Sequence, residues 1–454
     1  MVAIKELVHT EGDSNTTAAR SRWDSGQDDP RIRGLLDRDA SAFMHQSLSS
    51  PCLSTIAKAE GIWIEDTAGR RFMDFHGNSV HHLGYGHPKL VAAIKKQLDD
   101  LCFAPRRFTC EPAVELAEKL AELAPRDLGK VLFTTGGSDA IEVALKIARA
   151  ATGRFKTVSF WDAFHGAGFG AASVGGEATF RSHIAGPMMT GTEHVAPWDG
   201  YRCPYGHGTL EASGLACANM IAYVLGREQD VAAVVAEPMR ATPNPPPPGF
   251  WNRVREACDR HGTLLIFDEI PTGLGKTGKF FAHEHDGVTP DIVVLGKSLG
   301  GGILPIAAVI ARRDLDVTGG FAIGHYTHEK NPVTTRAALT TIDIILEEGL
   351  VERAAELGRH MLGRMQDLMG RSPHIGDVRG RGLMVGVELV EDRTSRQPAR
   401  DLAERVFYAC LERGLSFKVS HGNVLTLSPP LVISKADLDR ALDIVERAVL
   451  TALP

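Results

Sequence analysis

The chain has 454 residues, of which 43% are hydrophobic, so it is long enough for a large domain and a smaller one. A formal net charge of −6 argues against a general nucleic-acid-binding protein. No run of about 18 apolar residues predicts a membrane span, no apolar core predicts a secretory leader, and seven scattered cysteines are typical of a reducing cytoplasm.

The first 105 residues show a change of pattern near residue 45. Residues 1–45 are polar, mixed in charge and almost without periodicity, which is typical of a disordered tail. From Ile56 the chain alternates apolar and polar positions around an Asp-x-x-Gly turn, which predicts a hairpin. Helical periodicity then covers Lys89 to Leu101 and Glu111 to Leu123. The loop between these two segments carries Arg106 and Arg107, a pair that by itself indicates only a solvated loop.

A strand, a glycine turn and a helix follow from Val131. The helix has an apolar stripe that begins at Ile141, and the turn before it is Gly136-Gly137-Ser138. Glycine lets the backbone approach an anion, toward which the free N–H groups of a helix N-terminus point. Such turns also simply start helices, so the turn alone is weak evidence.

Two further apolar segments, which begin near residues 159 and 232, are followed by polar residues. SFWDAFHGAGFG places Phe164 and His165 after an apolar run, and AAVVAEPMRA predicts a buried strand that ends at Glu237. The proline-rich stretch 243–248 cannot donate to a sheet or continue a helix, so we expect a stiff loop there.

The stretch 264–302 carries the strongest chemical signal. Its apolar runs, Leu264 to Phe267 and Ile292 to Leu295, predict buried parallel strands, followed by Asp268 and by Lys297 with its glycines. Ligands collect at the carboxyl ends of such strands. A lysine for a Schiff base and a carboxylate for a pyridine nitrogen suit pyridoxal phosphate, whereas the alternative is an ion pair beside a glycine turn.

The last third of the chain continues with a strand in LPIAAVIAR and a polar segment, Thr327 to Pro332. From about Glu348 the pattern is helical. VRGRGLMVGVELV and NVLTLSPPLVIS predict strands of a small domain, which a helix over Lys435 to Leu450 closes. No Cys-x-x-Cys or His-x-x-x-His spacing indicates a metal site, so we expect none.

Five of these segments, in this order, resemble the motifs of the class III (ω-) aminotransferase family of pyridoxal-phosphate enzymes: GGSDA, FHG, the Asp268 strand, Lys297 with its glycines, and Thr327 to Pro332. The resemblance spans residues 50–450. It implies an α/β fold of the aspartate aminotransferase type (fold type I), with a large parallel-sheet domain and a small α+β domain. The implied parts are an arm or tail over 1–45, small-domain residues 46–105 and 341–454, and a large cofactor-binding domain over 106–340.

The resemblance also implies roles for individual residues. Lys297 matches the Schiff-base lysine and Asp268 the acid that keeps the ring nitrogen protonated. Phe164 matches the ring that stacks on the cofactor, where relatives usually have tyrosine. The remaining implied cofactor contacts are Gly136, Gly137, Ser138, His165, Glu237 and Thr327. The threonine of relatives reaches across a homodimer to the partner's phosphate, and their N-terminal arm packs on the partner subunit.

Departures from the family pattern bear on the reaction. Relatives that use α-keto acids usually have an arginine before the Pro-Pro of the small domain, and this chain has Thr426; the usual glutamine near the ring hydroxyl is Pro271. Arg106, Arg107 and Lys330 are candidate contacts for an anionic headgroup on a small amine substrate.

The sequences THEKNP and DEIPTGLGKTG resemble those of one branch of the family, the cytoplasmic ammonia-lyases of phosphonate catabolism. These enzymes convert 1-hydroxy-2-aminoethylphosphonate to phosphonoacetaldehyde and ammonia. An ordinary class III aminotransferase and a phospho-lyase on phosphoethanolamine-like substrates are the alternatives.

Overall fold

The computed structural model describes residues 17–46, 49–125, 127–182 and 185–452. Contacts divide the chain into two units: residues up to Gly77, Leu83–His87 and Ala354 onward form unit 1, whereas Asn78–His82 and Pro88–Arg353 form unit 2. None of the helices in the described ranges is long and apolar enough to cross a membrane.

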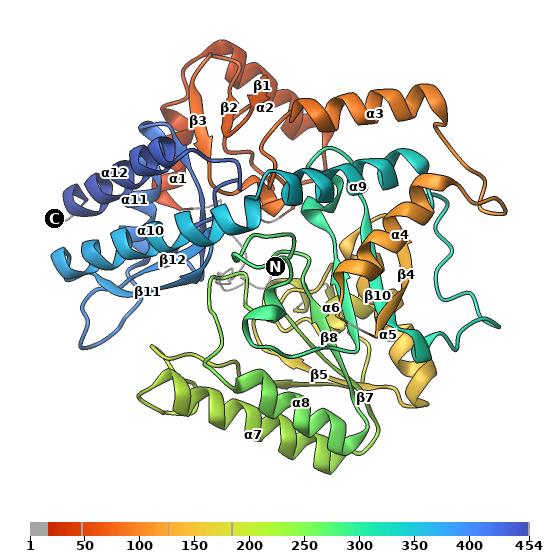
Figure 1. Ribbon diagram of the computed structural model, residues 1–454. Coiled ribbons are helices and arrows are strands. Elements are labelled where there is room, and N and C mark those ends of the chain that lie inside the picture. Colours follow the sequence, from red (N-terminus) through yellow and green to blue (C-terminus); the bar gives the residue numbers. More distant parts are fainter. Residues whose placement is uncertain (1–16, 47–48, 126, 183–184, 453–454) are drawn as a thin grey trace. The chain divides into compact units, whose positions relative to one another are not determined.

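Unit 2 is built on a seven-stranded sheet in its described part, in the order β4-β10-β9-β8-β7-β5-β6 (Figure 1). The strands from β9 to β6 are parallel, and β10 is antiparallel to both β9 and β4, so β4 runs in the same direction as β9. The strands are β4 (Leu128–Thr134), β5 (Lys156–Phe160), β6 (Thr192–Val195), β7 (Val231–Ala236), β8 (Leu264–Asp268), β9 (Ile292–Leu295) and β10 (Ala307–Arg312).

The parallel pairing of β8 and β9 confirms the strands predicted over 264–267 and 292–295. β10 confirms the strand predicted in LPIAAVIAR, and its antiparallel direction makes the sheet, which was predicted as parallel, a mixed one. The connection over residues 296–306 is shorter than the dozen or more residues that a parallel crossover needs, so β10 returns antiparallel.

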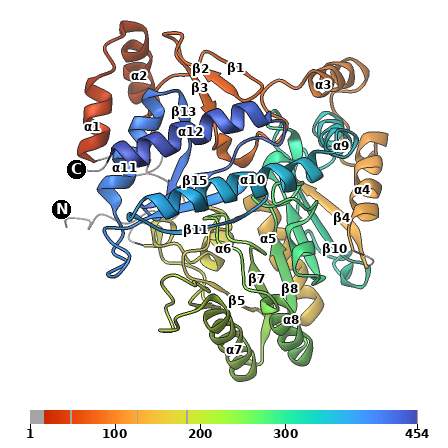
Figure 2. The ribbon, with the colours of Figure 1, turned by 60° about the vertical axis from the view of Figure 1, so that its left-hand side comes forward.

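Helices cover both faces of this sheet, because alternate residues of its strands point to opposite sides. Leu264 and Ile266 of β8 belong to the core under α5, whereas Leu265 and Phe267 belong to the core under α7 and α8. Figures 1 and 2 both show α7 beside α8. The helices of unit 2 are α3 (Pro88–Asp100), α4 (Glu111–Leu123), α5 (Gly137–Thr152), α6 (Phe169–Val174), α7 (Leu210–Glu228), α8 (Phe250–His261) and α9 (Pro332–Glu347), which packs on α3 and α4.

Unit 1 holds two small sheets in its described residues. The first, β1-β2-β3-β13, contains the predicted hairpin: Asp66 Oδ1 accepts hydrogen bonds from the backbone N–H groups of Ala68 and Arg70 at 2.9 Å each, which closes the turn. The second has the order β11-β12-β15-β14. The strands are β1 (Lys58–Glu60), β2 (Trp63–Glu65), β3 (Arg71–Asp74), β11 (Ile375–Arg381), β12 (Met384–Leu389), β13 (Leu415–Ser416), β14 (Lys418–Ser420) and β15 (Val424–Leu427).

The helices of unit 1 include part of the polar N-terminal segment. Arg20 donates to the carbonyls of Pro51 and Cys52, and the indole N–H of Trp23 donates to Leu53 O at 2.8 Å. These contacts hold a segment in which sequence periodicity is weak. The helices are α1 (Ala18–Ser25), α2 (Pro30–Ala42), α11 (Arg400–Glu412) and α12 (Lys435–Thr451), and the border between the units falls within α10 (Leu350–Arg371).

Candidate active site

Predicted site residues lie at or just after the ends of five strands of unit 2, along one edge of the sheet. β4 is followed by the Gly136-Gly137-Ser138 turn, β5 by Phe164 and His165, and β7 by Glu237, while Asp268 ends β8 and Lys297 follows β9. These five strands run in the same direction, so their carboxyl ends meet at the same edge. That edge is where ligands bind in such sheets.

Asp268 is buried and directed toward His165. Its Oδ2 lies 2.8 Å from His165 Nδ1, and its Oδ1 accepts the backbone N–H of Ile270 at 3.1 Å. The neighbouring acid, Glu269, has different partners: its carboxylate accepts the backbone N–H groups of Ala282 and His283, at 2.6 and 2.9 Å. Asp268 is therefore the acid of this pair that joins the predicted site, and Glu269 fixes a loop.

The predicted phosphate turn begins α5. Gly136 is the N-cap residue, and no side chain caps this end of the helix, so N–H groups of the first turn remain for an anion. Gly166 has a φ of +132°, and a Cβ there would lie 2.5 Å from Ser138 Oγ. The Ser138 hydroxyl also accepts the Ala167 N–H at 3.1 Å. The glycine turn and the loop with His165 are thus packed together at a distance that excludes side chains.

Ile270 connects this turn to the two chemical residues. A Cβ on Gly137 would lie 2.7 Å from Ile270 Cδ1, and one on Gly296 would lie 3.3 Å from Ile270 Cγ1. Gly296 precedes Lys297, and Ile270 donates its N–H to Asp268. Direct contacts therefore bring the phosphate turn, the Asp268 strand end and the Lys297 strand end together.

Lys297 has an unusual backbone for a residue with a side chain. Its φ of 45° lies in the left-handed region, where non-glycine residues are uncommon and often mark functional positions. The side chain is half-buried. The conformation turns the chain sharply at the end of β9, so the lysine stands at the sheet edge instead of continuing the strand.

These residues fit pyridoxal phosphate on their own chemistry. The uncapped helix N-terminus suits a phosphate, the buried Asp268 carboxylate suits a protonated ring nitrogen, and Lys297 supplies an amine at the same edge. Phe164 is half-buried, and its ring centroid lies 4.4 Å from that of Phe180. Glu237 is buried, and its Oε2 accepts the Ala241 N–H at 3.2 Å.

The remaining predicted residues lie in a second cluster of unit 2. Arg106 and Arg107 are exposed, and the Arg106 guanidinium donates to His325 Nε2 at 2.7 Å. Cys110 Sγ contacts the Lys330 carbonyl at 3.4 Å. Thr327 is exposed in the turn between these contacts. The structure thus joins the loop at 106–110 to the loop at 325–330, but it gives no direct contact between the described atoms of these residues and Lys297 or Asp268.

His82 is a site residue that the sequence analysis missed. It is fully buried, and its Nε2 donates to the carbonyl of Gly273, in the loop after Asp268. Burial, followed by the charge of Lys276, holds the pKa of His82 well below its usual value, so the ring is neutral. The carbonyl of Val80 lies 3.0 Å from where a Cβ on Gly302 would be. The segment with His82 thus packs on the loops that follow Asp268 and Lys297. The family resemblance of the residues on either side of it implied such a position, although His82 itself was not singled out.

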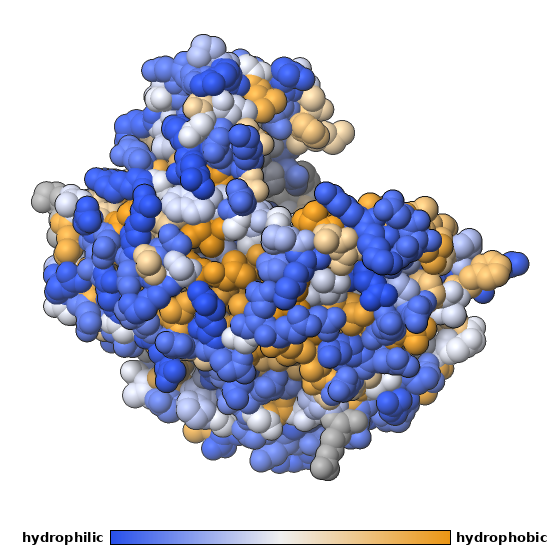
Figure 3. Space-filling model, turned by 45° about the horizontal axis from the view of Figure 1, so that its top comes forward, coloured by the Kyte–Doolittle hydropathy of each residue, from blue (hydrophilic) through white to orange (hydrophobic). Residues whose placement is uncertain are grey.

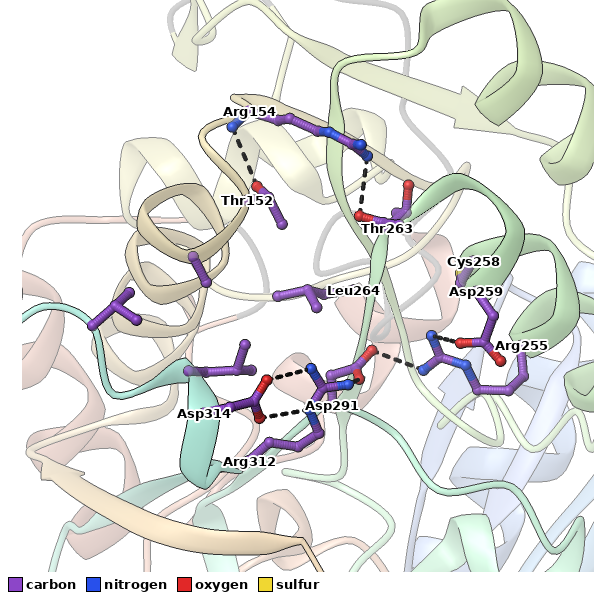
Figure 4. A pocket seen from close by; sticks show the side chains of 14 residues that line it. Thr152, Arg154, Arg255, Cys258, Asp259, Thr263, Leu264, Asp291, Arg312 and Asp314 are labelled. Atoms are coloured by element: carbon purple, nitrogen blue, oxygen red, sulfur yellow. Dashed lines mark hydrogen bonds and ion pairs between the residues drawn. The ribbon is translucent and has the colours of Figure 1, made fainter.

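A cavity of about 400 Å³ lies elsewhere in unit 2, beside the amino ends of β8 and β9 (Figure 4). Its arginines are engaged: Arg255 donates to Asp291 at 2.8 Å, and Arg312 pairs with both Asp291 and Asp314. Asp291 and Asp314 neutralise these two arginines, and the third arginine of the cavity, Arg154, donates to the carbonyls of His261 and Gly262. The cavity therefore contains a structural network at the end of the sheet opposite Lys297.

Comparisons with known proteins agree with this geometry. The family model described as aminotransferase class-III matches residues 44–449. The (R)-1-hydroxy-2-aminoethylphosphonate ammonia-lyase of Vibrio splendidus (strain 12B01) is 44% identical, over 97% of this chain and 95% of that protein. The leucine/methionine racemase of Thermococcus litoralis is 39% identical, over 88% and 91%.

Among solved structures, an (S)-enantioselective ω-transaminase from Thermomicrobium roseum matches with a TM-score of 0.87 and 30% identity, over 93% of this chain and 99% of that one. An ω-transaminase from Pseudomonas jessenii, in complex with PMP, matches with a TM-score of 0.87 and 28% identity, over 92% and 98%. These matches confirm the α/β fold and the cofactor predicted from the sequence. The chain is a pyridoxal-phosphate-dependent enzyme that belongs to the aminotransferase class III family.

Proposed function

We propose that this enzyme is an ammonia-lyase that converts 1-hydroxy-2-aminoethylphosphonate to phosphonoacetaldehyde and ammonia. The similarity to the Vibrio splendidus lyase extends over nearly the whole of both chains. The observation that favours a lyase over an aminotransferase is Thr426, at the position where the family resemblance places a carboxylate-binding arginine. This residue is buried in β15, and its hydroxyl lies 2.9 Å from Ser420 Oγ, so it offers no charge.

Without that charge, a keto-acid acceptor lacks its usual anchor. A charge-assisted hydrogen bond contributes about 1.5–3 kcal/mol, which corresponds to roughly ten- to a hundredfold in binding. An aminotransferase needs the acceptor in its second half-reaction, whereas a lyase needs only one organic substrate. The solved ω-transaminases are the reason to keep an aminotransferase as the second candidate.

The proposed reaction balances without an oxidant or an acceptor. The substrate loses a proton from its amine-bearing carbon, and its hydroxyl leaves the neighbouring carbon as water. Addition of water to the resulting enamine then releases ammonia and leaves the aldehyde. Bound pyridoxal phosphate supplies an electron-accepting pyridine ring for the carbanion.

The chain's own residues have separate roles in this proposal. The Lys297 amine would take the proton from the amine-bearing carbon, as a general base beside the substrate. Asp268, held by His165 and the Ile270 N–H, keeps a proton on the ring nitrogen. Gly136, Gly137 and Ser138 orient the cofactor phosphate.

The test is incubation of the purified enzyme with the hydroxylated aminoethylphosphonate and no keto acid. We expect release of ammonia and phosphonoacetaldehyde in equal amounts over many turnovers. Phosphoethanolamine in a parallel reaction, with phosphate as the readout, tests the phospho-lyase alternative. Turnover that begins only after pyruvate is added would identify an aminotransferase.

We also propose a homodimer with shared sites, in which Thr327 contacts the phosphate bound by the partner. Thr327 is exposed in its turn, and large apolar side chains of unit 2 are exposed as well, among them Phe108 at 67% and Phe321 at 77%. Hydrophobic residues also reach the surface on the face that Figure 3 shows. We expect these side chains to lie within the area that the partner subunit covers.

A further inference from the structure

Arg181 lies on the loop after α6, which packs against the segment with the predicted cofactor-binding residues Phe164 and His165. The backbone N–H groups of Gly176 and Glu177 both donate to the carbonyl of Ala163, at 2.8 and 3.2 Å. The Phe180 ring packs on the Phe164 ring at 4.4 Å between centroids. Arg181 therefore directly follows Phe180, whose ring contacts the predicted cofactor-stacking ring of Phe164.

The guanidinium of Arg181 has an aromatic neighbour and no acid. It lies over the Trp161 ring, 5.3 Å from its centroid, and its Nε is buried without a hydrogen-bond acceptor. Within the described chain, no carboxylate forms an ion pair with it, not even the nearby Asp162 and Glu177. Burial lowers the pKa of this guanidinium, and no neighbouring acid offsets the effect. The contrast is with Arg255 and Arg312, whose carboxylate partners are seen in Figure 4.

A second cation adds to the positive charge of the same loop. Arg240 is 6% exposed and donates to the carbonyl of Asp162 at 2.8 Å. His194 stacks on Trp161 at 4.7 Å, and burial lowers its pKa. Two arginines from other segments thus contact the loop over residues 161–164, Arg181 through the Trp161 ring and Arg240 through the Asp162 carbonyl. A half-buried guanidinium without an anion is costly, unless its partner is a ligand.

We propose that Arg181 binds the anionic headgroup of the substrate, a phosphonate or a phosphate monoester, with Trp161 as the platform that orients its guanidinium. The proposal rests on the function proposed above, because it names the headgroup contact of the same site. A planar guanidinium binds two oxygens of such a group at once and stacks well on an indole. Arg240 acts as a positioning residue, since it holds the loop through the Asp162 carbonyl.

The test measures headgroup binding apart from turnover. Methylphosphonate is titrated by calorimetry into the cofactor-loaded enzyme and its variants. We expect Arg181→Met to weaken binding about ten- to a hundredfold, and Arg181→Lys, which keeps the charge but loses the fork, to lie between Arg181→Met and the wild type. The matched control is Arg227→Met, because Arg227 also lies over an aromatic ring, 5.0 Å from the Tyr223 centroid, but at the end of α7. Its binding should equal that of the wild type.

Kinetics provides a readout that a merely structural role would not give. Arg181→Met should raise KM for the aminophosphonate by a similar factor and leave the visible absorbance of the bound cofactor unchanged. Equal methylphosphonate affinity in the wild type and Arg181→Met, or no binding by the wild type at millimolar concentration, would overturn the proposal. If Arg181→Met loses methylphosphonate binding but the wild type releases no ammonia, the lyase proposal fails and the anion site stands.

Discussion

At the scale of single residues, the structure distinguishes between side chains that the sequence presents as equals. Asp268 and Glu269 are adjacent: Asp268 ends β8, and Glu269 follows it. Because neighbouring residues of a strand point to opposite faces, one carboxylate meets His165 and the other meets the 282–283 backbone. The motif predicted which of the two would matter, but the partner of each depends on loops that are far away in the sequence.

We propose that turnover depends on Lys297. Lys297→Ala should abolish both the visible absorbance of the lysine-bound cofactor and the reaction, because Lys297 supplies the amine at the end of β9. Absorbance spectra and ammonia release provide the measurements. Lys279 is an exposed lysine in the loop between β8 and β9, so Lys279→Ala is the control and should behave like the wild type. Retention of both signals by Lys297→Ala would show that another lysine holds the cofactor.

Asp268 should matter more for catalysis than for folding. We expect Asp268→Asn to lower kcat roughly ten- to a hundredfold, since a charge-assisted hydrogen bond is worth about 1.5–3 kcal/mol, and to change the melting temperature little. Glu269→Gln is the companion variant: it should lower the melting temperature more than Asp268→Asn does. Near-normal kcat in Asp268→Asn would mean that a different group protonates the ring nitrogen.

At the scale of elements, the site depends on glycines where two loops meet closely. The turn before α5 and the loop after β5 touch at Gly166 and Ser138, and the turn also touches Ile270 through Gly137. The sequence predicted the turn and its helix from the glycines and the apolar stripe. It could not predict these contacts, because they join residues 136–138 to residues 166 and 270, and no local pattern encodes such a distance.

Gly166→Ala tests this close approach. A Cβ there would lie 2.9 Å from Ser138 Cα, and the φ of +132° is strained for alanine, so one of the loops must move. We expect the dissociation constant of pyridoxal phosphate to rise about tenfold or more in a titration of the apoenzyme. The control is Gly153→Ala, at the other end of α5. Gly153 has a φ of +67° and no atom near the position of an added Cβ, so this substitution introduces backbone strain but no clash. Unchanged affinity in Gly166→Ala would contradict the packing described for the phosphate turn.

At the scale of the whole molecule, the sequence predicted more of the large sheet than of the N-terminal segment. Apolar runs and their polar ends located β8 and β9, because buried parallel strands are apolar throughout. The antiparallel direction of β10 and the helices α1 and α2 were not predicted. The direction of β10 follows from the length of a connection, and α1 is held by Arg20 and Trp23 through tertiary contacts, which periodicity does not report.

The shared-site dimer makes a prediction about mixed subunits. Hybrids of Lys297→Ala and Thr327→Ala chains have one site free of both changes if Thr327 acts on the partner's phosphate. Such mixtures should recover up to about a quarter of wild-type activity, the product of half the molecules being hybrids and one of two sites being intact. If Thr327 acts within its own subunit, every site in the hybrid carries a change, and the mixture will show no more activity than its two parents.

The proposed lyase completes its reaction without an acceptor, and a single-turnover absorbance measurement tests this property most directly. The enzyme is mixed with less than one equivalent of 1-hydroxy-2-aminoethylphosphonate, and the visible absorbance of the Lys297-bound cofactor is followed. A lyase regenerates this absorbance unaided as ammonia is released, which is the result that we predict. If the absorbance stays lost until pyruvate or another keto acid is added, the enzyme is an aminotransferase, and the inference drawn from Thr426 is wrong.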